Sequence, residues 1–261
     1  MTDRLHVSEF GQGPVVMLVH AFPCSGEMWI PQAEALAAAG FRVLVPDLPG
    51  FGESGLRADE PSLEGVAADV LLLLTDRGID RAIIGGVSLG GYVAMTLART
   101  RPDVFAALIL CDTKATADTD AARDNRERLA RLCEESPGDT SRILEQAVLP
   151  GLLGETSFAT RPEVVAKVTT WLGQARPEAV AWYQRAMAGR PDSTAALREL
   201  AVPALIVWGE QDALSSRAEQ DIMLSSLDGA RLAPVPDAGH LANVERPDVV
   251  SAALVDFVRS I

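Results

Sequence analysis

The sequence has few cysteines, and this scarcity excludes several kinds of stabilised or metal-bound fold. Only three occur among 261 residues, Cys24, Cys111 and Cys133, and no two of them form a CxxC pair. A scattered and odd set of this kind argues against a disulfide framework or a structural zinc site. We therefore expect a protein of the reducing cytoplasm in which Cys24 and Cys111 are packing residues.

Basic residues are outnumbered as well. The chain has 23 Lys and Arg against 36 Asp and Glu, which gives a formal net charge of −13 at pH 7. Phosphate backbones and anionic lipid surfaces repel such a chain. We expect no nucleic acid and no membrane among its partners.

Long apolar runs are also missing. The longest, such as Val15–Val19 and Leu71–Leu74, fall well short of the roughly 18 residues that indicate a membrane span. The first residues, MTDRLHVSEFGQGP, lack the basic start and following apolar stretch of a signal peptide. We therefore expect a cytoplasmic protein without an export signal.

What is present is the composition of an ordinary globular chain, 48% hydrophobic and 23% charged. Short aliphatic runs alternate with longer helical patterns through residues 1–112. Such alternation is typical of parallel strands joined by crossover helices, and the lack of polar alternation within the runs indicates a sheet covered on both faces. The expected strands are Val15–Val19, Arg42–Val45, Ala82–Gly86 and Ala106–Leu110, and the expected helices are Trp29–Ala39, Leu63–Asp76 and Gly90–Arg99.

The alternation stops after Asp112 and resumes after Leu200. Between them the patterns are helical, over 118–136, 162–174, 177–188 and 192–200. Strands are again expected over 204–208 and 230–234, and helices over 218–227 and 247–259. We predict an α/β fold with a mostly parallel central sheet flanked by helices, in which residues 1–112 and 201–261 form the core. Residues 113–200 are then an inserted helical cap, or lid.

The segment Gly86-Val87-Ser88-Leu89-Gly90-Gly91 follows an expected strand and precedes an expected helix. In that context GxSxG predicts a sharp, strained turn that exposes the hydroxyl of Ser88 as a nucleophile. The chain can bend so tightly only if Gly86 and Gly90 present no side chains to each other. A glycine-rich turn with a capping serine is the alternative. A phosphate loop is disfavoured, because no Lys follows Gly90 and no GxGxxG register is present.

A serine needs a base to remove its proton, and the chain has only three histidines. We expect His6 to be a solvated strand residue and His20, at the end of a strand, to have a structural role. His240 stands in a loop between the last expected strand and the final helix, where a mobile base is typically found.

The base in turn needs a carboxylate that fixes its tautomer and stabilises its protonated form. Asp212 follows the strand over 204–208, which places it at the carboxyl edge of the sheet, and it gives the chain order Ser, Asp, His. Asp112 also stands at that edge and is the stronger alternative. Glu210 is the weaker one, expected to be a solvated turn residue.

Together these motifs resemble the α/β-hydrolase superfamily over nearly the whole chain, and within it the serine esterase and enol-lactonase branch. The segments His20-Ala21-Phe22-Pro23 and 46–54 resemble the family's oxyanion loop and the signature that follows it. The resemblance implies an oxyanion hole formed by the backbone N–H groups of Phe22 and Leu89. Relatives usually have His-Gly where this chain has His20-Ala21, and a positive φ at Ala21 would cost about 1 kcal/mol or more.

The resemblance implies a serine hydrolase with no metal or organic cofactor, which cleaves small, fairly apolar carboxylic esters through an acyl-enzyme. A serine nucleophile disfavours the dehalogenase and epoxide-hydrolase branches, which use aspartate. The cap supplies candidate substrate-binding residues, namely Trp182, Met187, Leu152 and Leu153, although such side chains equally pack a lid onto a core.

Other functions are compatible with the same residues. One is a lactonase of the 3-oxoadipate enol-lactonase kind, and another is a hydrolase of carbon–carbon bonds. A ligand receptor without turnover, or a lyase or acyl-transferase that excludes water, are further alternatives. The sequence leaves the natural substrate and the oligomeric state open.

Overall fold

A seven-stranded sheet forms the centre of the fold in the computed structural model, which describes residues 5–261. The first four residues, included in the expected core range and in the expectation of no export signal, lie outside the described part. The strand order is β1-β3-β2-β4-β5-β6-β7, and every neighbouring pair is parallel except β1 with β3. The strands are β1 (Val7–Phe10), β2 (Val15–Val19), β3 (Arg42–Pro46), β4 (Ala82–Val87), β5 (Phe105–Cys111), β6 (Ala204–Gly209) and β7 (Arg231–Val235).

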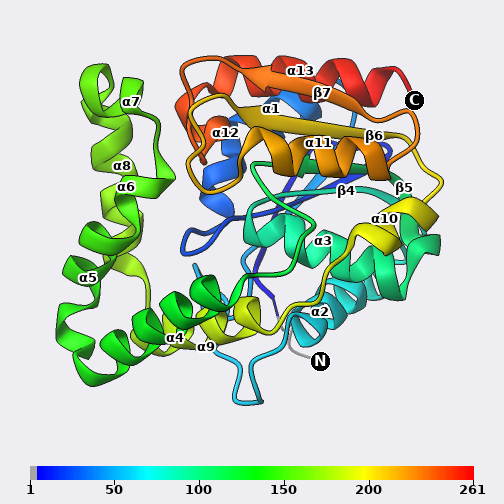
Figure 1. Ribbon diagram of the computed structural model, residues 1–261. Coiled ribbons are helices and arrows are strands. Elements are labelled where there is room, and N and C mark those ends of the chain that lie inside the picture. The colour runs from blue at the N-terminus through cyan, green and yellow to red at the C-terminus, as the bar shows by residue number, and fades with distance from the viewer. Residues whose placement is uncertain (1–4) are drawn as a thin grey trace.

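Helices cover both faces of the sheet (Figure 1). On one face α1 (Ile30–Ala38) packs against α13 (Pro247–Arg259). The other face carries α2 (Leu63–Asp76), α3 (Leu89–Thr100), α10 (Thr194–Glu199) and α11 (Arg217–Ser226). Because both faces are covered, the strands β4 and β5 are buried almost throughout, which explains their uninterrupted apolar sequences. The predicted α/β architecture is confirmed.

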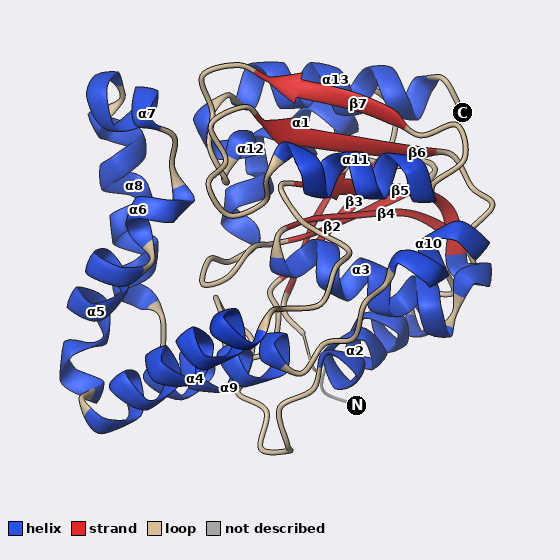
Figure 2. Cartoon of the chain, in the orientation of Figure 1, coloured by secondary structure: helices blue, strands red, loops and turns tan. Residues whose placement is uncertain are grey.

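Six helices between β5 and β6 form an arm beside the sheet. They are α4 (Asp120–Glu135), α5 (Thr140–Ala147), α6 (Leu149–Leu152), α7 (Glu155–Thr160), α8 (Pro162–Gln174) and α9 (Pro177–Ala188). In Figure 2 the arrowheads of β6 and β7 point toward the column of α6, α7 and α8, so this arm stands at the carboxyl ends of the strands. The helix α10, although inside the range 113–200 expected for the cap, packs against the core helices α3 and α11.

None of the helices in residues 5–261 combines the length and the apolar character needed to cross a membrane. The three cysteines are all buried and free. Burial raises the pKa of the Cys24 thiol to about 12, with a smaller contribution from the nearby charge of Glu27. These thiols pack as small apolar groups, as the sequence predicts.

Candidate active site

Ser88 occupies the one-residue turn between β4 and α3, with the backbone angles φ 53° and ψ −108°. A Cβ on Gly86 would lie 2.3 Å from the carbonyl carbon of Gly90, and a Cβ on Gly90 would lie 2.1 Å from the carbonyl oxygen of Val19. Neither distance is possible for a real side chain, so both positions require glycine. The strained strand-to-helix turn predicted around Ser88 is therefore present.

The Ser88 side chain makes no capping hydrogen bond to α3. It instead lines a cavity of about 260 Å³, together with His240 and Phe22. The alternative of a capping serine in a glycine-rich turn is therefore wrong.

His240 lies in the loop between β7 and the short helix α12 (Ala242–Glu245), with 3% of its surface exposed. Its Nδ1 lies 2.9 Å from Oδ2 and 3.0 Å from Oδ1 of Asp212. An ionised carboxylate can only accept hydrogen bonds, so Nδ1 carries the proton and donates it to Asp212. The Nε2 atom of His240 is then left as an acceptor.

The carboxylate of Asp212 is itself held by the turn that follows it. Oδ1 accepts hydrogen bonds from the N–H groups of Leu214 (2.7 Å) and Ser215 (3.1 Å), and Oδ2 accepts one from the Ser215 hydroxyl. Burial alone would raise the pKa of Asp212, but the charge of His240 and these hydrogen bonds outweigh it and lower the pKa from its ordinary value. Asp212 therefore remains a carboxylate beside the histidine.

Neither alternative carboxylate contacts the histidine in the described chain. Asp112 is fully buried, and its oxygens accept hydrogen bonds from the N–H groups of Gly209 (2.7 Å) and Ala242 (3.2 Å). Burial, followed by the charge of Asp212, raises the pKa of Asp112 well above its ordinary value. Glu210 is exposed at the end of β6. Asp112 thus connects the end of β6 to the start of α12 through hydrogen bonds. Asp212 is the carboxylate that contacts His240.

The other two histidines lie outside the cavity. The Leu48 N–H donates to Nε2 of His20 (2.8 Å), so Nδ1 carries the proton and donates to the Ala21 carbonyl (2.9 Å). Burial lowers the pKa of His20, which supports a neutral ring with the predicted structural role. His6 was expected to be a solvated strand residue, but it precedes β1, is half-buried and lies with Nδ1 3.0 Å from Oδ2 of Asp47.

The resemblance to the family assigns the oxyanion hole to the backbone amides of Phe22 and Leu89. Phe22 lines the cavity, and Leu89 is the first residue of α3, where an N–H has no partner inside the helix. Neither N–H makes a backbone hydrogen bond to another loop or turn of the described chain. Ala21 is not among the described non-glycine residues with positive φ, so the cost considered for alanine at this position does not arise.

The cap supplies the opposite wall of the cavity. Leu152 and Met187 line it, as the sequence predicts. Leu153 does not, because it lies just beyond α6, buried, with its backbone against Gly239.

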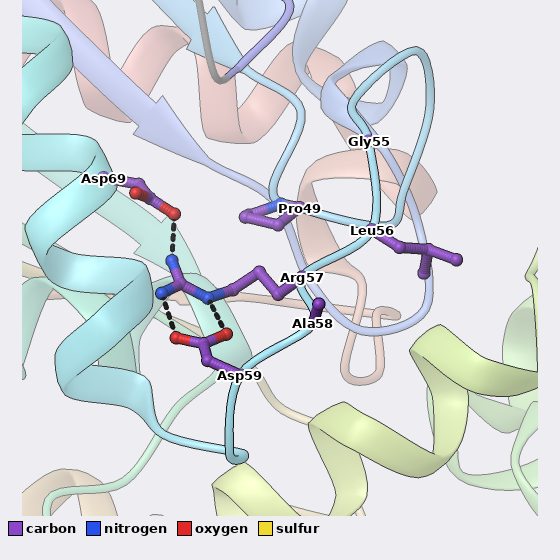
Figure 3. A pocket seen from close by; sticks show the side chains of 7 residues that line it. All are labelled: Pro49, Gly55, Leu56, Arg57, Ala58, Asp59 and Asp69. Atoms are coloured by element: carbon purple, nitrogen blue, oxygen red, sulfur yellow. Dashed lines mark hydrogen bonds and ion pairs between the residues drawn. The ribbon is translucent and has the colours of Figure 1, made fainter.

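Trp182 also lies away from the cavity. Its Nε1 donates to the Asp59 carbonyl (2.8 Å), and Arg57 lies over its ring at 5.9 Å. Figure 3 shows Arg57 between the carboxylates of Asp59 and Asp69, beside a separate hollow of about 360 Å³. Residues two apart on a helix point about 200° apart, so Trp182 faces away from the cavity that Gln184 of α9 lines. Trp182, predicted to bind substrate, is thus not among the residues that line the cavity with Ser88, and its ring attaches α9 to this loop.

A buried carboxylate that the sequence does not reveal connects the cap to the histidine loop. Glu245 in α12 is 3% exposed. One oxygen accepts a hydrogen bond from the Gly239 N–H (2.6 Å), and the other accepts from the Gly154 N–H (2.8 Å) and the Ser157 hydroxyl (2.6 Å). Gly239 immediately precedes His240, so Glu245 positions the histidine loop against α7. No motif or spacing marks it, since its cap partners Gly154 and Ser157 are distant in sequence.

We expect Glu245→Gln to lower kcat by roughly ten- to a hundredfold, because a displaced histidine loop misplaces the base. The amide can accept on one side only, which leaves a buried N–H without its partner. Steady-state kinetics against a Glu155→Gln control, an exposed position on α7, measures the effect. A change in KM alone, with kcat and its pH profile unaltered, would contradict a positioning role.

A second buried carboxylate, Asp118, lies in the cavity wall and contacts three positively charged side chains. Its oxygens lie 2.5 Å from Arg126 Nε, 2.8 Å from Arg190 Nη1 and 3.5 Å from Lys114 Nζ. Burial would raise the pKa of Asp118, but the charges of Arg126 and Arg190 outweigh it and lower the pKa. Asp118 is therefore ionised at neutral pH.

Asp118→Asn should lower the free energy of unfolding at pH 7 by about 3 kcal/mol, because it leaves the buried Arg190 without its counter-ion. The folded-state pKa of Asp118 is lowered, so its stabilisation is present above the unfolded-state pKa, near 3.9, and is lost as pH falls through the folded value. Urea unfolding of both proteins at several pH values should therefore show a difference that shrinks toward pH 3. An equal difference at every pH would contradict an ionic origin.

The strand order, the Ser88 turn at the carboxyl edge of the sheet and the arm of helices define a protein of the α/β-hydrolase class. The chain belongs to the Alpha/beta hydrolase family, which matches residues 16–253.

Several relatives resemble the chain along its whole length. A pimeloyl-(acyl-carrier protein) methyl ester esterase of Aromatoleum aromaticum is 30% identical over 94% of this chain and 98% of its own. A thermophilic esterase from Thermogutta terrifontis, solved with malate bound, is 39% identical with a TM-score of 0.92, covering 98% of this chain and 93% of its own. The enol-lactonase from Burkholderia xenovorans is 28% identical with a TM-score of 0.87, covering 98% and 96%.

Proposed function

We propose that the protein is a serine hydrolase that cleaves small carboxylic esters through an acyl-enzyme. One observation carries the proposal: Ser88 and His240 line the same cavity, and Nδ1 of that histidine donates to Asp212. This is the relation between nucleophile, base and carboxylate that acyl transfer requires.

In the mechanism, Ser88 Oγ attacks the ester carbonyl while His240 Nε2 takes its proton. The negative charge on the carbonyl oxygen is stabilised by the N–H groups of Phe22 and Leu89, and removal of one such donor typically costs roughly a hundred- to a thousandfold in rate. His240 then protonates the leaving alcohol, and the acyl group stays on Ser88. Water attacks this acyl-enzyme with His240 as the base, the bond between the acyl group and Ser88 Oγ breaks, and His240 returns the proton to Oγ as the acid product leaves. Asp212 stabilises the protonated histidine in both halves.

The relatives support a carboxylic ester or lactone as the substrate, since two of those described above are esterases and one is an enol-lactonase. A lactone is an internal ester, so the same steps open its ring. The cavity of about 260 Å³ suits a small substrate, and Leu129, Leu152 and Met187 offer apolar contacts to its carbon chain. Lactone hydrolysis is therefore the second candidate function.

Hydrolysis of p-nitrophenyl esters from acetate to decanoate tests the proposal, together with labelling by a fluorophosphonate that reacts with activated serines. We expect turnover of the short esters and a single label, located at Ser88 by mass spectrometry. A protein that neither turns over an ester or a lactone nor takes the label would favour the receptor alternative. Ester formation with an added alcohol in place of the free acid would indicate an acyl-transferase.

A further inference from the structure

The charged side chains that line the cavity are two cations and one carboxylate, Lys114, Arg126 and Asp118. The single negative charge of Asp118 is shared with a third cation, Arg190, which lies behind the wall with only 4% of its side chain exposed. The wall therefore has more positive than negative charge, although the whole chain has a formal net charge of −13.

Arg190 is the second cation that contacts Asp118, after Arg126, and structural partners surround it. Besides the contact to Asp118 at 2.8 Å, its guanidinium donates to the carbonyl oxygens of Met187 and Thr116, both at 3.0 Å. It also lies over the ring of Tyr92, 3.9 Å from the ring centre. All these contacts hold Arg190 in place inside the protein, where it faces structural partners.

Lys114 and Arg126 keep free bonding capacity toward the cavity. The Lys114 ammonium has three donors, and its one contact in the described chain is Asp118 at 3.5 Å, beyond a good hydrogen bond. Arg126 donates Nε to Asp118, while its Nη1 makes only long contacts to Gln184 (3.3 Å) and Met187 (3.4 Å). Both side chains are about four-fifths buried, with 20% and 19% exposed, so water compensates their charge only in part.

The cationic wall lies close to the serine. The Thr113 hydroxyl, next to Lys114 in the chain, donates to the Ser88 carbonyl (2.9 Å). Tyr92, whose ring Arg190 contacts, is four residues beyond Ser88 along α3, a rise of about 6 Å. Ser88, Lys114 and Arg126 line the same cavity of about 260 Å³, so one small substrate can contact all three.

We propose that Lys114 and Arg126 bind the carboxylate of an anionic substrate, so that the ester or lactone hydrolysed here has a second, ionised carboxyl group. This inference rests on the proposed hydrolase function and narrows its substrate class to half-esters of short dicarboxylic acids and related lactone acids. A planar carboxylate matches the guanidinium fork of Arg126, and the Lys114 ammonium adds a point charge.

The test compares two methyl esters with five-carbon acyl chains, monomethyl glutarate and the neutral methyl pentanoate, by methanol release. We expect a higher kcat/KM for the anionic ester, and we expect Lys114→Met to lower the anionic-to-neutral ratio by roughly ten- to a hundredfold. Lys114→Arg, which keeps the charge, should retain the preference. The chain has one other lysine, Lys167, on the cap helix α8 outside the cavity, and Lys167→Met is the matched control.

Melting temperatures identify a variant that fails to fold, and Lys114→Gln then takes its place. The inference would be overturned if kcat/KM for the anionic ester were no higher than for the neutral one and Lys114→Met left this ratio unchanged. The hydrolase function would still stand in that case. If the protein hydrolyses neither ester, the proposed function fails for such esters, and calorimetric titration with glutarate decides the anion site alone. Binding that Lys114→Met abolishes would support the site, and the absence of binding would overturn it.

Discussion

Ser88→Ala and His240→Ala should each lower kcat for a short p-nitrophenyl ester by about four to six orders of magnitude. The reason is that the hydroxyl and the imidazole act in one step, in which the serine attacks as its proton leaves. Removing either group therefore abolishes the acyl-enzyme route. The double variant should be scarcely slower than either single variant, because effects within one catalytic unit do not add.

Steady-state kinetics at saturating ester measures both effects, and His6→Ala is the control for the loss of a histidine. His6 is half-buried beside Asp47, outside the cavity that Ser88 lines, so its removal should leave kcat within a few-fold of the original value. Far-UV circular dichroism should show that every variant is folded. Full activity in Ser88→Ala would mean that another group attacks the ester and that the proposed mechanism is wrong.

The sequence predicts those parts of the fold whose determinants are local. The bounds of α2, α8, α9 and α13 agree with the prediction at both ends, because an apolar stripe and a capping serine or first-turn proline define each one. The edge strand β1 was expected only through His6 and without bounds, since it is short and its residues are only partly buried. The helices α5, α6 and α7 were missed because prolines and glycines interrupt 137–154, and contacts between elements stabilise these short helices.

The candidate site likewise has parts that the local sequence determines and parts that it does not. The turn at Ser88 follows from neighbouring residues, and the loops holding Asp212 and His240 follow from the strands that precede them. The wall of the cavity depends instead on how the cap packs against the core. Contacts between α4, α9 and the loop that precedes α4 set the direction of the Trp182 side chain. The same contacts place Lys114, Arg126 and Arg190 around Asp118. No local pattern specifies such contacts, so the apolar substrate pocket expected from the sequence is partly a charged one.

Asp212→Asn should lower kcat by about four orders of magnitude at neutral pH while leaving the protein folded, as expected for the loss of the correct histidine tautomer. Asparagine has the shape of aspartate but replaces one oxygen by an NH2 group. Oδ1 of Asp212 accepts two backbone N–H groups, from Leu214 and Ser215, so the amide oxygen has to remain there. The NH2 group then occupies the position of Oδ2, which lies 2.9 Å from Nδ1 of His240, slightly nearer than the amide oxygen at the position of Oδ1 (3.0 Å).

An NH2 group at that position donates to Nδ1, so the histidine keeps its proton on Nε2 and cannot accept one from Ser88. Kinetics of Asp212→Asn beside Glu210→Gln, an exposed carboxylate two residues earlier, measures the effect, and the control should be unchanged. Activity within tenfold of the original protein would show that another carboxylate orients the ring. Asp112 is the stronger alternative from the sequence, but its two oxygens accept from Gly209 and Ala242. Reaching His240 would require it to leave two buried N–H groups unpaired. The hydrogen bonds of the two aspartates therefore explain why only one of them can serve the histidine.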